Sequence, residues 1–113
     1  MAQLALNKFL TIRHNITSSN VGIYTAPTGV ASIVLLAQVS NVGTGSSTHT
    51  VTASHSRGGV DARLVKETPV PVNDSVSLLT GRLILETGDV FKIQGSANNT
   101  MEIVLSVLES AKR

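Results

Sequence analysis

The chain has 113 residues, no cysteine and a formal net charge of +2. This length fits one domain with a single core, and the lack of cysteine excludes disulfides and thiolate metal sites. The basic residues are scattered and only three residues are aromatic, which argues against nucleic-acid binding because that function relies on basic patches and stacking rings.

The N-terminal residues 4–14 alternate in part between apolar and polar side chains, which predicts a strand. Leu6, Lys8, Leu10 and Ile12 share one face of it, and Phe9 lies on the other. We expect residues 1–19 to form a separate N-terminal strand or arm. The same stretch has no basic region followed by a long apolar block, so we expect no secretory signal.

Residues 30–42 (VASIVLLAQVSNV) form the longest apolar run. Apolar residues occupy both parities at 33–36, which is typical of a strand covered on both faces. We therefore predict that this segment is the central strand. No apolar run is long enough to span a membrane, so we expect no membrane partner.

Residues 48–56 (THTVTASHS) alternate strictly, with Thr and Ser on one face. This pattern predicts a half-exposed strand of low hydrophobicity, at a sheet edge or facing a neighbouring subunit. His49 and His55 would stand about 20 Å apart on an extended strand, too far to share one metal ion.

The C-terminal half predicts short strands joined by turns. Residues 61–68 read as a strand, and the two prolines in 69–74 predict a segment that runs along an edge or crosses between sheets. Residues 83–85 and 90–93 flank 86–89 (ETGD), which predicts a tight hairpin with Gly88 at positive φ. Residues 101–109 predict the last strand, and 110–113 a tail.

About eight strands with turn signals every 8–12 residues are the pattern of a sandwich or barrel. We predict an all-β fold, an antiparallel β-sandwich of jelly-roll or immunoglobulin-like type, with its domain at residues 20–109. No serine lies in a G-x-S-x-G elbow, and no acidic loop has calcium-binding spacing. We expect no enzyme activity, no metal and no cofactor.

Several segments, taken in order, resemble small virion structural proteins of tailed bacteriophages, in particular those of cyanobacterial phages. The segments are residues 23–29 (IYTAPTG), 32–41 (SIVLLAQVSN), 64–66 (LVK), 78–81 (LLTG), 83–89 (LILETGD) and 106–109 (SVLE). They are turn and strand patterns with no chemical group of their own. The resemblance implies a non-catalytic β-sandwich present in many copies on the particle and assembled in the host cytoplasm.

The resemblance leaves the place on the virion open. A capsid decoration (cement) protein, which binds and bridges major capsid protein subunits, is the first choice; a neck or collar component and a tail or fibre accessory protein are alternatives. A cement protein suggests a homotrimer. A carbohydrate-binding module is a further alternative, weakened by the scarcity of aromatic residues.

Two segments are the candidates for contacts with other subunits. Strands like the N-terminal one can add to a neighbour's sheet, and the low charge of the chain, 14% of its residues, favours association. The candidate interface residues are Leu6, Lys8, Phe9, Leu10, Ile12, His49, Thr50, Thr52 and His55.

Overall fold

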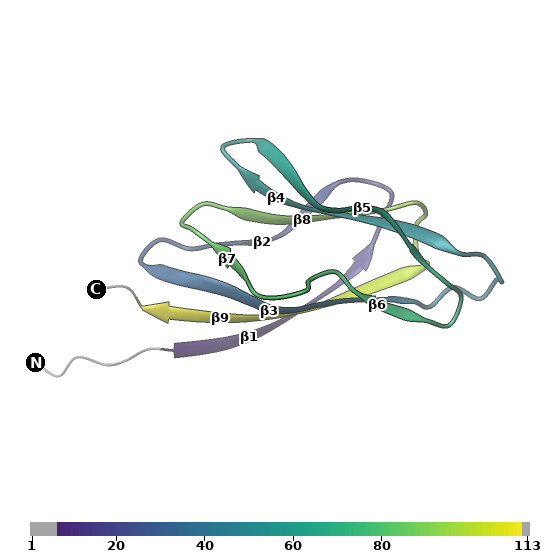
Figure 1. The fold of residues 1–113 in the computed structure, drawn as a ribbon, viewed down its shortest axis with the longest axis horizontal. Coiled ribbons are helices and arrows are strands. Elements are labelled where there is room, and N and C mark those ends of the chain that lie inside the picture. Colours follow the sequence, from purple (N-terminus) through teal and green to yellow (C-terminus); the bar gives the residue numbers. More distant parts are fainter. Residues whose placement is uncertain (1–6, 112–113) are drawn as a thin grey trace, which may run out of the picture.

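The computed structural model describes residues 7–111, in which nine strands form two antiparallel sheets packed face to face (Figure 1). The strands are β1 (Asn7–Ile16), β2 (Val21–Thr25), β3 (Val30–Asn41), β4 (His49–Arg57), β5 (Val60–Val70), β6 (Ser75–Ser77), β7 (Leu83–Leu85), β8 (Val90–Gly95) and β9 (Met101–Ala111). The described residues form no helix, and so none that could cross a membrane. The predicted all-β sandwich is confirmed.

The order of the strands identifies the type of sandwich. The first sheet, sheet A, has the order β1-β9-β3-β6, with β7 also paired to β3; the second, sheet B, has the order β2-β8-β4-β5. Every connection crosses between the sheets except β4–β5 and β6–β7. This winding is that of a jelly roll, in which β6 and β7 act as one interrupted strand; an immunoglobulin-like domain has more hairpins within its sheets.

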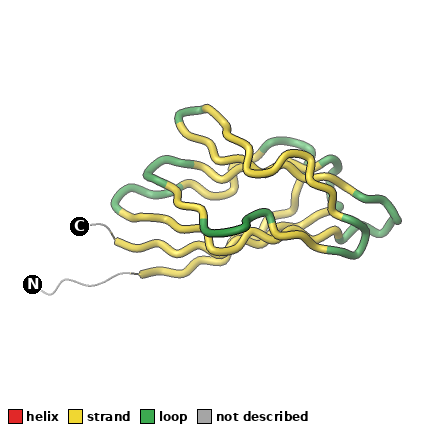
Figure 2. Tube along the Cα trace, viewed as in Figure 1, coloured by secondary structure: helices red, strands yellow, loops and turns green. Residues whose placement is uncertain are grey.

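The core lies between the sheets and is almost entirely aliphatic. Alternate residues of β9, from Met101 to Val107, are fully buried, as is Leu85. Phe91 is the one large aromatic side chain among the fully buried residues that the structure describes. Figure 2 shows the strands filling both layers, with most loops toward the two ends.

The prediction of a hairpin around residues 86–89 was wrong, although the turn itself is present. The Asp89 amide donates to the Glu86 carbonyl at 2.8 Å, and Gly88 has a φ of 87°. However, β7 pairs with β3 in sheet A, whereas β8 pairs with β2 and β4 in sheet B. Two apolar runs around a tight turn do not reveal whether the runs pair or diverge, and here each fills the inner face of a different sheet.

For residues 48–56 two positions were predicted, at a sheet edge or facing a neighbouring subunit, and the edge position was wrong. β4 lies inside sheet B, between β8 and β5, and its Ser54 and Ser56 are buried. Ser54 stands between Lys92 and Arg63 in the sheet register. The small hydroxyls made the strand look exposed, but they sit beside longer side chains of the neighbouring strands.

β3 is the central strand of sheet A, as predicted, with β9 on one side and β6 and β7 on the other. It is not covered on both faces, because Leu35 and Leu36 are 38% and 36% exposed. The register shifts between Val34 and Leu36, which marks a β-bulge. One extra residue at a bulge changes the parity of the strand, and this explains why apolar residues fall on both parities.

The proline-rich connector lies along a sheet edge and then crosses between the sheets, as predicted. Pro69 lies in β5, an edge strand of sheet B, and residues 71–74 lead from sheet B to sheet A. At the chain ends, β1 belongs to the same sheet as β9, and β9 continues to Ala111. The first two residues of the expected tail therefore lie in a strand.

The turn at Gly88 generates a stability prediction. A Cβ at Gly88 meets no atom within 4 Å, so substitution there acts through the positive φ alone. We expect Gly88→Val to lower the free energy of unfolding by about 1–2 kcal/mol. Urea titration measures this, with Gly45→Val as the control because Gly45 has open space and no positive φ. Equal stability of the two variants would contradict the strained turn.

Candidate assembly interface

The predicted interface residues of the N-terminal strand divide between two environments. β1 is an edge strand whose ten residues pair with β9 without a register shift. Phe9, 72% exposed, and the exposed Lys8 are open to a partner, whereas Leu10 and Ile12 pack against the core. Leu6 lies outside the described residues. The addition of this strand to a neighbour's sheet stays a prediction about the assembly.

The predicted residues of β4 lie in the other sheet, so the structure does not bring the two groups together. Thr50 and Thr52 line a shallow hollow of about 280 Å³. The Thr52 hydroxyl accepts from the Glu67 amide at 3.0 Å. His49 is half-buried, and His55 points to a carboxylate of its own chain. All four residues are half-buried, and the side chains of Thr52 and His55 are engaged in contacts within the chain.

The outer face of sheet A carries a row of apolar side chains that includes one predicted residue and three that were missed. In the register, Phe9 pairs with Leu108, Leu108 with Ile33, and Ile33 with Ile84. Directly paired residues share a face, so one line of apolar side chains crosses β1, β9, β3 and β7. Ile84 is 61% exposed. We call these four residues the apolar row; the exposed Leu36 follows nearby on β3.

The outer face of sheet B is mainly polar. Thr52 pairs with Gln94, and Ser54 pairs with Lys92 and Arg63. Asp61 accepts from the Asn20 amide group at 3.0 Å and lies 3.5 Å from the Lys92 ammonium. The pKa of Asp61 is lowered by the Ser56 hydroxyl, with smaller contributions from Asn20 and Lys92. The two outer faces of the sandwich therefore differ in chemistry.

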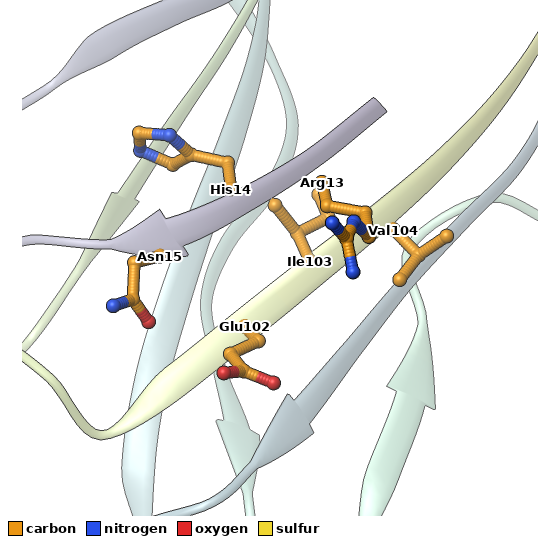
Figure 3. A pocket seen from close by; sticks show the side chains of 6 residues that line it. All are labelled: Arg13, His14, Asn15, Glu102, Ile103 and Val104. Atoms are coloured by element: carbon orange, nitrogen blue, oxygen red, sulfur yellow. The ribbon is translucent and has the colours of Figure 1, made fainter. Parts of the chain in front are cut away.

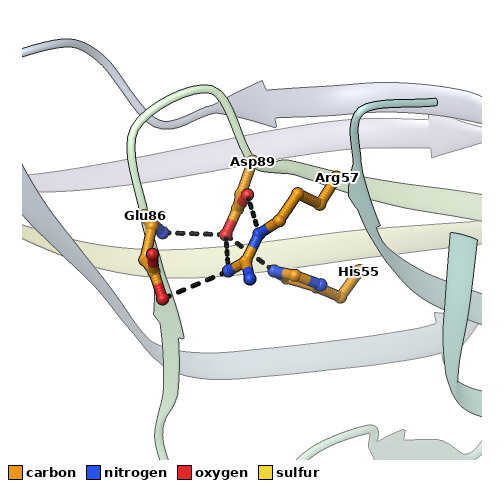
Figure 4. Close-up of polar contacts among 4 residues, drawn as sticks. All are labelled: His55, Arg57, Glu86 and Asp89. Carbon is orange, nitrogen blue, oxygen red and sulfur yellow. Dashed lines mark hydrogen bonds and ion pairs between the residues drawn. The ribbon is translucent and has the colours of Figure 1, made fainter. Parts of the chain in front are cut away.

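A buried carboxylate joins the inter-sheet turn to the end of β4 (Figure 4). Asp89 is 1% exposed and accepts two bonds from Arg57, from Nε at 2.8 Å and from Nη2 at 2.7 Å. The His55 Nε2 atom lies 2.8 Å from Asp89 Oδ2, and the Glu86 amide donates to the same oxygen at 2.9 Å. The Arg57 bonds hold the pKa of Asp89 well below its usual range, against the opposing effect of burial.

Both oxygens of Asp89 are hydrogen-bonded within the chain, Oδ1 by Arg57 alone and Oδ2 by Arg57, His55 and the Glu86 amide. The Ala26 amide donates to the Asp89 carbonyl at 2.9 Å, which adds the end of β2 to the same junction. The Asp89 carboxylate thus connects segments far apart in the sequence, and no spacing in the sequence indicated it.

A second polar contact lies near the start of β3. The Tyr24 hydroxyl bonds to Glu109 and lies 2.9 Å from the Ser32 hydroxyl. Burial, followed by the bond to Glu109, raises the pKa of Tyr24 to about 12. Tyr24 packs against the core, so its ring is not presented to a ligand.

A hollow of about 320 Å³ lies over β1 and β9 (Figure 3). The residues that line it, all labelled in Figure 3, are Arg13, His14, Asn15, Glu102, Ile103 and Val104. No group of three metal-ligating residues occurs among residues 7–111. The hollow offers a mixed polar surface beside the apolar row.

The missed residues Leu108, Ile33 and Ile84 left a weak signal in the sequence. Leu83-Ile84-Leu85 are three consecutive apolar residues in a strand, and alternation requires the middle one to face away from its neighbours. Leu85 is buried, which places Ile84 outside. The pairing that aligns the four side chains could not be read from the sequence.

Comparisons with known proteins support the fold alone. No family model matches the chain, and no curated protein matches it. A structure of Bacillus endospore appendages, described as a novel family of disulfide-linked pili, is similar at 19% identity, with a TM-score of 0.54 over 96% of this chain and 89% of that chain. The Eiger TNF from S. frugiperda is 10% identical over 93% of each chain, with a TM-score of 0.41.

The Asp89 cluster generates a pH prediction. A lowered pKa in the folded state means that the charged carboxylate stabilises the fold above the unfolded pKa, about 3.9, and that this stabilisation is lost as the pH falls toward the folded value. We expect Asp89→Asn to lower the Tm at pH 7 by roughly 5 °C or more. Thermal melts should show the gap to the parent narrowing below about pH 4. A gap that is the same at pH 7 and pH 2 would contradict the cluster's role.

Proposed function

We propose that this protein is a non-enzymatic structural protein of a phage virion, and specifically a decoration protein that bridges neighbouring shell subunits. The apolar row on the outer face of sheet A is the observation that carries the proposal. Phe9 and Ile84 are mostly exposed while Ile33 and Leu108 between them are half-buried, and apolar patches on a protein surface mark contacts with other proteins. The resemblance of the sequence to phage virion proteins is the reason for proposing a virion as the assembly to which this surface binds.

The mechanism of adhesion is burial of the apolar row against a shell subunit. Phe9 and Ile84 stand at the two ends of the row and are its most exposed members. Burying them removes apolar area from water at roughly 25 cal/mol per Å² before the costs of association. Because the row carries no charge, we expect binding to the shell to be only weakly sensitive to salt.

The absence of catalysis is part of the same proposal. The most heavily hydrogen-bonded ionisable cluster, at Asp89, is saturated by contacts within the chain. A general base needs a basic group that a substrate can reach, whereas Asp89 is 1% exposed and its pKa is held well below the usual range. The hydrogen bonds within the chain that engage Asp89 therefore favour a structural role for the Asp89 cluster.

Two alternatives remain for the same fold. A neck, collar or tail accessory protein would use the apolar row in a ring with higher cyclic symmetry. A carbohydrate-binding module would need aromatic rings for stacking, and Phe9 is the one exposed ring among residues 7–111. A glycan array tests the second alternative directly.

Immunogold labelling of purified phage particles tests the location. With an antibody to this chain, we expect label spread over the whole head in electron micrographs. Label confined to one vertex or to the tail would replace decoration by the neck or tail alternative. Particles without label would contradict the virion proposal.

The apolar row can be tested by one substitution and a matched control. We expect Ile84→Lys to reduce binding to undecorated shells at least tenfold, because a charge would have to be buried in the contact. Val60→Lys is the control, since Val60 is 73% exposed and lies in sheet B. Co-sedimentation with shells measures binding, and both variants should keep the parent Tm. If the two variants bound shells equally well, the apolar row would not be part of the contact.

A further inference from the structure

β1 is the most open edge among the strands that the structure describes. It runs for ten residues with no proline, glycine or bulge. Natural proteins protect sheet edges with prolines, bulges, short strands or charged side chains, and of these devices β1 has only the charged Lys8 and Arg13. The other three edges have such devices: β5 contains Pro69 and shifts of register, β2 has a shift of register, and β6 and β7 have three residues each.

We infer that the β1 strands of two copies pair antiparallel around a twofold axis at Thr11, which joins their A sheets into one continuous sheet. This contact goes beyond the binding of a shell, because it needs only the isolated chain. Antiparallel pairing of identical strands is isologous, so each residue on one copy meets a defined residue on the other.

The sequence of β1 selects this register. Residues opposite each other in an antiparallel pair share a face, so the twofold axis must pass through a residue and not between two. With the axis at Thr11, Leu10 lies opposite Ile12 of the second copy, and Asn7 lies opposite Asn15. An axis at Leu10 or at Ile12 would instead place the Lys8 ammonium opposite an isoleucine, Ile12 or Ile16.

The pairs formed around Thr11 include a complementary contact on each face of the sheet, while Lys8 comes opposite His14 of the second copy. On the outer face, Phe9 meets Arg13 of the second copy, and a guanidinium over an aromatic ring is attracted to the negative face of the ring. The twofold axis makes this contact twice. Phe9, 72% exposed in the single chain, and the exposed Arg13 each gain a neighbour. On the inner face, Leu10 and Ile12 extend the half-buried apolar surface.

A second copy supplies a defined partner for each residue of this edge. The Asn–Asn, Lys–His, Phe–Arg and Leu–Ile pairs all come from one nine-residue segment, 7–15, paired with itself. The pairing also leaves the apolar row open at Ile84, the end remote from β1. A dimer would thus carry two copies of that surface, one at each side.

Disulfide trapping tests the register, because the chain has no cysteine of its own. In Thr11→Cys, the two thiols of a dimer face each other across the axis, within the 4.4–6.8 Å Cα separation that a disulfide allows. The control Asn15→Cys lies on the same face of the same strand, but its thiols would be eight residues apart, about 27 Å. Both variants are oxidised with copper phenanthroline and run on non-reducing gels.

We expect a disulfide-linked dimer for Thr11→Cys and a monomer band for Asn15→Cys. The double variant Asn7→Cys, Asn15→Cys should also form a linked dimer, because those residues are opposite each other. No linked dimer from Thr11→Cys, or equal linkage of Thr11→Cys and Asn15→Cys, would overturn the inference.

A charge exchange provides a test without oxidation. Phe9→Lys would oppose Arg13 of the second copy with a like charge, and we expect the dimer dissociation constant measured by analytical ultracentrifugation to rise at least fivefold. Adding Arg13→Glu should restore it, because the introduced ammonium would then face a carboxylate. Failure of the second substitution to restore the dimer would overturn the register, while virion labelling would be unaffected.

Discussion

The burial of aliphatic side chains between two sheets is the interaction on which this structure depends. Because the chain has few aromatic residues, the core is stabilised by close packing of aliphatic side chains rather than by large aromatic rings. Gly95 shows how close the approach is: a Cβ there would lie 2.7 Å from Ile16 and 2.9 Å from Met101. The jelly-roll winding serves the same end, because each crossing sends the next apolar run to the inner face of the opposite sheet.

The same packing leaves two outer faces of different chemistry. Sheet B presents Thr, Ser and paired charges to water, whereas sheet A presents a line of Phe, Leu and Ile side chains. Sheet A also ends in β1, a regular edge strand. The face that we propose to bind other subunits and the edge that we propose to pair with a second copy therefore belong to one sheet. This concentration of contact surfaces suits a protein that works only in an assembly.

The sequence was sufficient for the fold class, the central strand and the turn at Gly88, because these follow from alternation and from residues with special backbone preferences. It was insufficient where long-range pairing decides. The run Leu83-Ile84-Leu85 looked like half of a hairpin, yet it pairs with β3. The serines of β4 suggested an edge, yet the strand is internal. For the candidate interface, Phe9 could be predicted from the pattern of its own strand. Leu108, Ile33 and Ile84 lie in line with Phe9 only because of the strand pairing, which the sequence does not reveal.

Hydrogen exchange of backbone amides, followed by mass spectrometry at low and high protein concentration, tests the central claim that sheet A is the contact surface. The account predicts that association slows exchange in β1, whose outer edge becomes hydrogen-bonded, and leaves exchange in β5 unchanged. Unchanged exchange in β1 when the protein associates would contradict the account. Slower exchange in β5 would also contradict it and would place the contact on sheet B.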